Sequence, residues 1–89
     1  MVRLFVRHPV SDYAAWRQAY DAFDEERGGW GVTGHAVYRS VDDPNDVTVT
    51  HDFASREAAV EFMDAPRLRE VMEQAGVAGV PEVWITTPA

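Results

Sequence analysis

The sequence predicts an α+β fold of the ferredoxin-like type, βαββαβ, in which a four-stranded antiparallel sheet carries two helices on one face. Residues 35–53, in the middle of the chain, have the pattern of two strands joined by a polar turn, because residues 42–46 gather aspartate, proline and asparagine. On either side of this hairpin lies one apolar strand-like run and one helix-like run. The 89 residues are therefore expected to form one domain, residues 1–89.

The first half of the chain supplies one strand and one helix. Residues 2–8 alternate in character, with Val2, Leu4 and Val6 on one face of the strand and Arg3, Phe5 and Arg7 on the other. Ser11 or Asp12 is the expected N-cap of a helix that ends at Gly28 and Gly29. An aromatic stripe at steps of three and four residues favours packing of this helix on the sheet over stacking on a cofactor: Tyr13, Trp16, Tyr20 and Phe23.

The second half repeats the order. In the second hairpin strand Val47, Val49, His51 and Phe53 share one face, and Thr48, Thr50 and Asp52 share the other. Ser55 is the expected cap of a second helix, which Pro66 divides into two pieces because proline cannot occupy a helix interior. Gly76 ends the second piece, and residues 80–87 form the last strand, with Trp84 and Thr86 on the face opposite Val83 and Ile85.

Composition excludes several classes of function. A formal charge of -7, with fifteen acidic residues against eight arginines and no lysine, argues against a nucleic-acid or anionic-membrane partner. The absence of cysteine excludes thiol catalysis and cysteine-ligated metal sites. No stretch approaches the ~20 apolar residues of a membrane helix, and Arg3 and Arg7 interrupt any signal-like run, so a cytoplasmic location is expected.

One face of the predicted sheet has a composition that suits neither water nor a dry core. Two helices cover only one face of a four-stranded sheet. By alternation the other face combines large aromatic and hydrogen-bonding side chains: Phe5, Tyr38 and Trp84 with Arg3, Arg7, Thr48, Thr50 and Asp52. Pairing with the same face of a second subunit would bury the aromatics around a cavity, so a homodimer is predicted over a monomer with scattered surface aromatics.

Four segments together resemble a known family. They are residues 6–17 (VRHPVSDYAAWR), residues 33–39 (TGHAVYR) with the turn at residues 42–45, residues 68–77 (LREVMEQAGV) and residues 81–84 (PEVW). These segments resemble the small dimeric α+β barrel proteins of the antibiotic biosynthesis monooxygenase superfamily, in particular its short branch labelled cyclase or monooxygenase. The resemblance covers nearly the whole chain and implies the fold and the homodimer.

Members of that superfamily with known chemistry oxidise polycyclic aromatic polyketides without metal or flavin, degrade haem, or isomerise lactones. The resemblance disfavours haem as a cofactor, because the haem-degrading branch has an asparagine on its first strand and this chain has Asn45 only in the hairpin turn. The cofactor-free oxygenases use Asn, Trp, Tyr, His and Arg around their cavity. The candidate site residues of this chain include all of these types except asparagine.

The candidate site residues follow from the mixed sheet face. Tyr38 or Asp52 is predicted to handle a proton, and Arg7 is predicted to stabilise an enolate or phenolate charge. The predicted substrate-binding residues are Phe5, Arg3, Trp84, Thr48, Thr50, His35 and His51. For His51 the alternative is packing under the helices, and for Asp52 it is a solvated carboxylate at the end of a strand. The three histidines lack the spacing of metal ligands, so no metal is predicted.

Two functions remain open from the sequence. The first is a monooxygenase or cyclase that needs no cofactor and acts on an aromatic or polyketide-like small molecule in a cavity at the sheet face. The alternative is a small-molecule-binding or sensing dimer of the same fold without catalysis. Whether the chain is an enzyme is therefore left open. In either case the ligand is expected to be small and apolar or aromatic.

Overall fold

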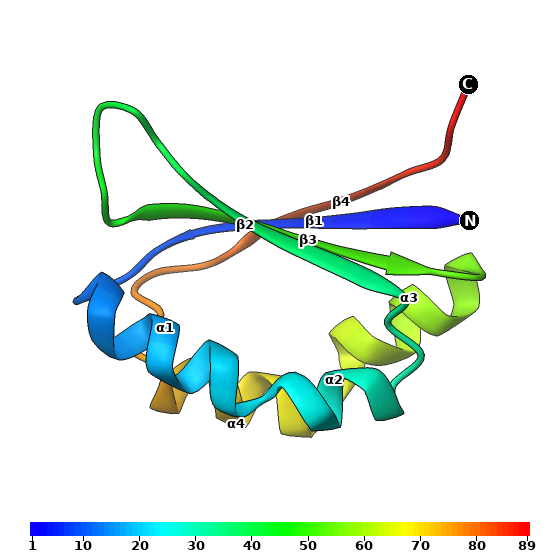
Figure 1. Cartoon of the computed structure of the whole chain (residues 1–89), viewed down its shortest axis with the longest axis horizontal. Helices are drawn as coiled ribbons and strands as arrows, with labels where there is room; N and C mark the ends of the chain where they lie inside the picture. The colour runs from blue at the N-terminus through cyan, green and yellow to red at the C-terminus, as the bar shows by residue number, and fades with distance from the viewer.

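The computed structural model describes residues 1–89 and contains four strands and four helices (Figure 1). In chain order they are β1 (Val2–Pro9), α1 (Tyr13–Ala22), α2 (Asp24–Gly29), β2 (Gly34–Arg39), β3 (Asp46–Phe53), α3 (Arg56–Asp64), α4 (Pro66–Gln74) and β4 (Glu82–Thr86). Each predicted helix thus consists of two short pieces, and the predicted order of strands and helices is confirmed.

The four strands form one antiparallel sheet in the order β2-β3-β1-β4. Strand β1 lies in the centre, where Phe5 pairs with Thr50 of β3 on one side and with Trp84 of β4 on the other. This is the strand order of the ferredoxin-like fold, so the predicted fold class is confirmed. The register also fixes the two faces as predicted, because residues paired across antiparallel strands point to the same side.

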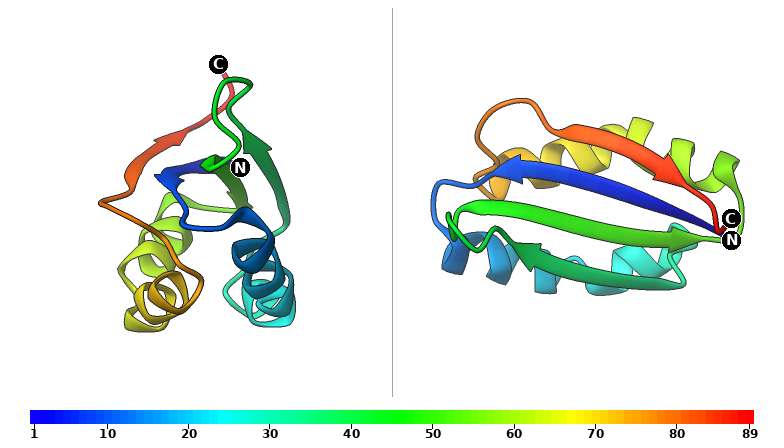
Figure 2. Two further views of the ribbon diagram at one scale, coloured as in Figure 1. Left: turned by 90° about the vertical axis from the view of Figure 1, so that its left-hand side faces the viewer. Right: turned by 90° about the horizontal axis from the view of Figure 1, so that it is seen from above.

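All four helices lie on one side of the sheet (Figure 2). Helices α1 and α2 run below one half of the sheet, and α3 and α4 run below the other half. We call the side of the sheet that faces the helices the inner face and the opposite side the outer face. No element of the chain covers the outer face.

The first predicted helix is interrupted at Phe23, where the sequence predicts a continuous helix to Gly28. The amide of Phe23 donates to both Ala19 O and Tyr20 O, each at 3.2 Å, so the helix tightens at this point. The side chain of Arg27 then donates from Nη2 to Tyr20 O at 2.7 Å. A side chain from the next turn thereby satisfies a carbonyl at the end of α1, which the spacing of apolar residues does not reveal.

The other helix ends match the sequence. Asp12 accepts a hydrogen bond from Ala14 N at 3.0 Å, and Ser55 accepts one from Ala58 N at 3.2 Å, so both act as N-caps. Ala65 has extended backbone (φ -66°, ψ 127°) directly before Pro66, which begins α4. The predicted division of the second helix at Pro66 is therefore confirmed.

The core between sheet and helices consists of two groups of buried apolar residues. One surrounds Phe53 and Phe62 and includes Leu4, Val6, Phe23, Ala59 and Leu68. The other surrounds Trp16 and Val49 and includes Val10, Tyr20, Val47 and Ala75. None of the helices has the length and apolar character that crossing a membrane requires.

Candidate functional site

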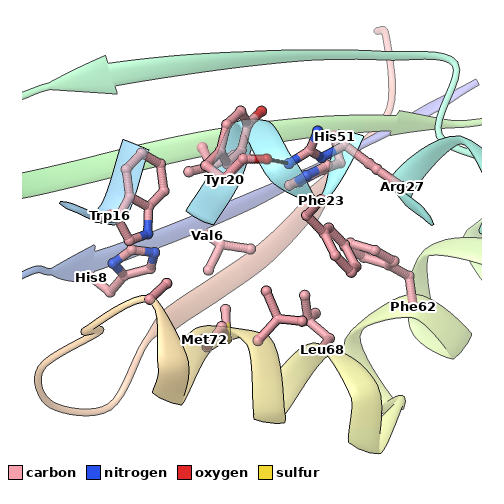
Figure 3. A pocket seen from close by; sticks show the side chains of 13 residues that line it. Val6, His8, Trp16, Tyr20, Phe23, Arg27, His51, Phe62, Leu68 and Met72 are labelled. Carbon is pink, nitrogen blue, oxygen red and sulfur yellow. Dashed lines mark hydrogen bonds between the residues drawn. The ribbon is translucent and has the colours of Figure 1, made fainter. Parts of the chain in front are cut away.

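A cavity lies on the inner face, between the sheet and the two rows of helices, where the two groups of core residues meet (Figure 3). Its volume is about 50 Å³. Thirteen residues line it, ten of them hydrophobic: Val6, His8, Trp16, Tyr20, Phe23, Arg27, Val49, His51, Phe62, Leu68, Val71, Met72 and Ala75. The aromatic stripe predicted for the first helix supplies three of these residues, so it forms a cavity wall as well as core.

The cavity has one aromatic and one aliphatic wall. The rings of Trp16 and Tyr20 stack with centroids 5.0 Å apart on α1, and Phe62 of α3 lies 5.1 Å from the ring of His51. Helix α4 supplies the aliphatic side chains of Leu68 and Met72, among others. Flat aromatic walls with few polar atoms suit an apolar, planar ligand.

The volume limits what the cavity holds in this conformation. A water molecule needs about 10–15 Å³ of such volume, so the cavity has room for a few waters or a very small ligand. A larger molecule requires side chains of α4 to move. Met72 is only partly buried, and its flexible thioether side chain changes rotamer at little cost.

His51 lines this apolar cavity and has one buried polar atom without a partner. It is 6 % exposed, and its Nδ1 has no hydrogen-bond partner. Burial, together with the electrostatic effects of Arg27 and His35, lowers the pKa of His51 to about 3. The imidazole is therefore neutral near pH 7, and its Nδ1 makes no hydrogen bond within the protein.

Arg27 is the second unusual group, because its guanidinium is buried. Its side chain is 2 % exposed and lies over the ring of Tyr20, with Cζ 3.9 Å from the ring centroid. Nη1 donates to Asp24 Oδ1 at 3.1 Å and Nη2 donates to Tyr20 O, but Nε has no acceptor. Buried charged groups normally have all their hydrogen bonds made, so Nε of Arg27 is an exception among the buried polar atoms.

A chain of hydrogen bonds links the cavity wall to solvent. Tyr20 Oη and His35 Nδ1 are 2.6 Å apart, and His35 Nε2 is 3.1 Å from Asp24 Oδ1. A carboxylate only accepts, so Nε2 carries a proton, and in the neutral imidazole Nδ1 accepts from the tyrosine hydroxyl. Burial raises the pKa of Tyr20, which keeps this hydroxyl protonated at neutral pH.

Comparison with solved structures identifies the fold. No protein-family model and no curated protein sequence matches the chain. SnoaB, a cofactor-independent oxygenase from Streptomyces nogalater, superposes with a TM-score of 0.80 at 15 % identity over 99 % of this chain and 92 % of that one. This chain shares the fold of structures described as antibiotic biosynthesis monooxygenases.

Two further structures of similar size agree. A structure described as an antibiotic biosynthesis monooxygenase gives a TM-score of 0.75 at 11 % identity, over 100 % of this chain and 99 % of that one. Rv0793 from Mycobacterium tuberculosis gives 0.71 at 19 % identity, over 99 % and 94 %. The monooxygenase-like resemblance predicted from sequence is thus confirmed at the level of the fold, which the protein shares along its whole length.

Most of the site residues predicted from sequence lie on the outer face of this monooxygenase-like fold. There the charged ones are paired: Arg3 forms two hydrogen bonds with Asp52, at 2.7 and 3.1 Å, and Arg7 forms two with Asp46, at 3.0 and 2.7 Å. Hydrogen bonds from these arginines lower the pKa of both carboxyl groups. Asp52 is therefore an ionised partner of Arg3 in the single chain.

The aromatic residues of the outer face are half-buried or exposed. Phe5 and Trp84 stack with centroids 5.2 Å apart, and Tyr38 is 58 % exposed. Thr48 is partly buried and Thr50 is buried among its neighbours on β3. The outer-face residues surround no enclosed cavity within one chain, so their role as a site stays a prediction that depends on a second subunit.

The two histidines lie on the other side. His35 and His51 pair across β2 and β3 and point to the inner face, where His51 lines the cavity and His35 holds Tyr20. Among the predicted site residues, only His51 lines the cavity, and His35 is connected to it through Tyr20. Sequence reasoning missed Tyr20 and Arg27, although Arg27 continues the helical spacing of residues 16, 20 and 23.

No group of three or more histidine, aspartate or glutamate side chains is placed to hold a metal ion. His8, at the far end of the cavity, has its Nδ1 3.3 Å from Pro9 O, and burial lowers its pKa. The polar side chains that line the cavity are therefore two histidines and one arginine, together with the polar atoms of Trp16 and Tyr20.

Proposed function

We propose that the protein binds an aromatic or polyketide-like small molecule in the inner cavity and oxidises or cyclises it without a cofactor. The observation that carries this proposal is a cavity with aromatic walls that is lined by His51, whose buried Nδ1 has no hydrogen-bond partner. The fold shared with SnoaB, which is described as a cofactor-independent oxygenase, supports it.

Binding follows from the composition of the walls. A flat ring system would lie between the aromatic side chains of α1 and α3 and the aliphatic side chains of α4. The neutral imidazole of His51 would orient one hydroxyl or carbonyl group of the ligand, because no protein atom competes for Nδ1. The side chains that enlarge the cavity are then Leu68 and Met72.

The chemistry needs only molecular oxygen as a second reactant. Loss of a proton from an activated methylene group gives an electron-rich carbanion or enolate, which reduces O₂. The overall change converts the methylene and O₂ into a carbonyl group and one water molecule, so atoms and electrons balance. The chain Tyr20–His35–Asp24 offers a route for the proton toward solvent.

The alternative function is binding or sensing without turnover. One observation favours it: with its pKa lowered to about 3, His51 is a weak base. Oxygen consumption separates the two functions, because a binder shows tryptophan quenching with no turnover.

The outer face supports a second part of the proposal, a homodimer. Trp84 and Tyr38 leave large aromatic surface exposed there, at 42 % and 58 %, beside the stacked ring of Phe5. Pairing of two outer faces would bury these rings, and the predicted roles of Tyr38, Asp52 and Arg7 would then belong to a cavity between subunits.

The proposal is tested by measuring oxygen uptake with a tricyclic phenol that carries a reactive methylene group. Met72→Trp should fill the inner cavity and abolish uptake, at a stability cost of about 1–3 kcal/mol. Glu73→Trp adds the same ring to the exposed side of α4 and should leave uptake unchanged. Uptake that survives Met72→Trp in a folded protein would remove the inner cavity from the proposal.

A further inference from the structure

We infer that the ion pair between Glu26 of α2 and Arg67 of α4 is a latch that closes the inner cavity, and that a ligand enters when the N-terminal end of α4 moves away from α2. This inference rests on the proposed function, since it describes entry to the same cavity. It is carried by a cavity of about 50 Å³ whose two helical walls are joined by one ion pair.

The latch connects the two rows of helices that lie below the sheet (Figure 2). Arg67 donates from Nε to Oε1 and Oε2 of Glu26, at 3.2 and 3.0 Å, and from Nη2 to Oε1 at 2.8 Å. On each side the next residue along the chain lines the cavity, Arg27 on α2 and Leu68 on α4. The ion pair therefore joins the two walls directly beside the cavity.

No other hydrogen bond or ion pair joins helices α1 and α2 to helices α3 and α4. Apolar side chains also meet across the cavity, and the rings of Phe23 and Phe62 have centroids 6.4 Å apart. Apolar contacts are non-directional, so these side chains can pack against a ligand ring as they pack against each other. The latch is the directional contact that has to break before the two rows separate.

Helix α4 is anchored at one end and loosely joined at the other. Just after its C-terminal end, Gly76 O accepts a hydrogen bond from Ser11 N at 3.0 Å, which ties this end to the connection between β1 and α1. At its N-terminal end Pro66 has no N–H, so the helical hydrogen bonds of α3 do not continue into α4. Release of Arg67 thus frees the first turn of α4, which carries Leu68 of the cavity wall.

The latch has the strength of a contact that opens and closes readily. The side chains of Glu26 and Arg67 are 46 % and 44 % exposed, and an exposed ion pair changes an equilibrium by about two- to five-fold. Arg67 Nη1 also donates to Glu70 Oε1 at 2.9 Å, on its own helix. When Arg67 leaves Glu26 it therefore keeps a carboxylate partner, which limits the cost of the open state.

The test uses N-phenyl-1-naphthylamine, an uncharged aromatic dye that fluoresces in apolar surroundings and is larger than the closed cavity. By stopped-flow fluorescence, Arg67→Met should raise the association and dissociation rates of the dye about two- to five-fold each, with little change in Kd. Because the dye is uncharged, added salt should speed its entry into the wild type through the ion pair alone, and should not affect Arg67→Met.

Unchanged rates in Arg67→Met would overturn the inference. Met72→Trp fills the cavity and should abolish the fluorescence signal. A wild-type protein that binds no dye, or dye binding that survives Met72→Trp, would also overturn the inference, since no ring then enters the cavity.

Arg17→Met provides the matched control. It breaks an ion pair with Asp21 that is similarly exposed, at 43 % and 60 %, but lies within α1 and joins no two helices. Both rates and their dependence on salt should stay as in the wild type. An effect equal to that of Arg67→Met would contradict a specific latch.

A reversible cross-link tests the closed state. The chain has no cysteine, so Glu26→Cys combined with Arg67→Cys creates its only two thiols, which a short bifunctional methanethiosulfonate can join. The linked protein should lose dye binding, and reduction should restore it. A linked protein that binds the dye as fast as the reduced one would contradict the inference.

The inference and the proposed function fail separately. Dye entry controlled by the ion pair, without oxygen uptake, would leave the latch in a binding protein. Oxygen uptake with dye rates independent of the ion pair would leave the oxygenase without the latch.

Discussion

The two faces of the sheet carry similar residue types but satisfy them differently. On the outer face each arginine forms two hydrogen bonds with a carboxylate on the neighbouring strand, Arg3 with Asp52 and Arg7 with Asp46. On the inner side, Arg27 of α2 and His51 of β3 each keep one polar atom without a partner, although both are buried. Unsatisfied buried groups are costly, so they are retained where they act on something else, and this contrast supports the proposed ligand site on the inner face.

The polar groups on the two sides of the sheet also differ in their exposure to solvent. The outer ion pairs are partly exposed, so they contribute little to stability and can separate when a partner binds. The inner groups lie in a low-dielectric cavity, where one charge has a strong effect on its neighbours. The outer face therefore suits association, and the inner face suits chemistry.

The largest expected effect tests whether the outer face is the subunit interface. Trp84→Arg places an unpaired charge in the proposed subunit interface, at a cost of about 3–5 kcal/mol. Sedimentation should show a wild-type dimer and a variant monomer. Val60→Arg, at an exposed valine on α3, is the control and should stay dimeric. A dimer that survives Trp84→Arg would remove the outer face as the interface.

The next comparison tests the two faces by matched truncations. Phe62 is fully buried at the cavity, whereas Phe5 is half-buried on the outer face. Phe62→Ala should lower the free energy of unfolding by about 3–4 kcal/mol, and Phe5→Ala by less than half of that in the monomer. Urea denaturation of dilute protein gives both values, and equal losses would contradict the assignment of the core.

The pH dependence of stability should separate the faces as well. The folded pKa of His51 is about 3, below its unfolded value, so folding favours the neutral form. This stabilisation is complete above about pH 6.5 and is lost as the pH falls toward 3, up to about 3 kcal/mol between pH 7 and 4. The lowered pKa of His8 adds to the loss in the upper part of this range.

The outer carboxylates act in a different pH range. The pKa values of Asp46 and Asp52 are lowered from about 3.8, so their stabilisation is present above that value and is lost only as the pH falls below it. His51→Leu should therefore make the free energy of unfolding less dependent on pH between 6.5 and 4. The loss of stability below about pH 3.8, where the carboxylates titrate, should remain. Thermal melts across pH measure this, and an unchanged upper limb would contradict the buried neutral histidine.

The smallest expected effects come from two substitutions that distinguish the inner cavity from the outer face as the site. Tyr38→Phe and His51→Gln each keep the approximate size of the side chain and alter its polar group. If the inner cavity is the site, His51→Gln should lower oxygen uptake about 10–100-fold and Tyr38→Phe should leave it unchanged. The reverse result would favour the outer-face site predicted from sequence.

The fold was predictable because local signals agree with one another. Alternation placed Leu4 and Val6 opposite Arg3 and Phe5, and Pro66 marked the division between α3 and α4, as the structure confirms. The break at Phe23 was not predictable, since a side chain of the following turn, Arg27, helps to produce it.

The candidate site was predictable only in part. The mixed composition of the outer face drew attention to Tyr38, Asp52 and Arg7, because a sequence shows residue types and not which polar atoms are already paired. The ion pair between Arg3 and Asp52 becomes visible only with the register of β1 against β3. Likewise arginine is usually an exposed residue type, and the burial of Arg27 depends on how α2 packs beside Tyr20.

The central claim, that the ligand binds under the helices, is tested most directly by methyl NMR during titration with a tricyclic phenol. Ring currents from a bound aromatic ligand should shift the methyl signals of Leu68, Val71 and Met72, which line the inner cavity. The methyl signals of Ala36 and Thr48, on the outer face, should stay in place. Shifts confined to Ala36 and Thr48 would contradict the account and place the site between the sheets of two subunits.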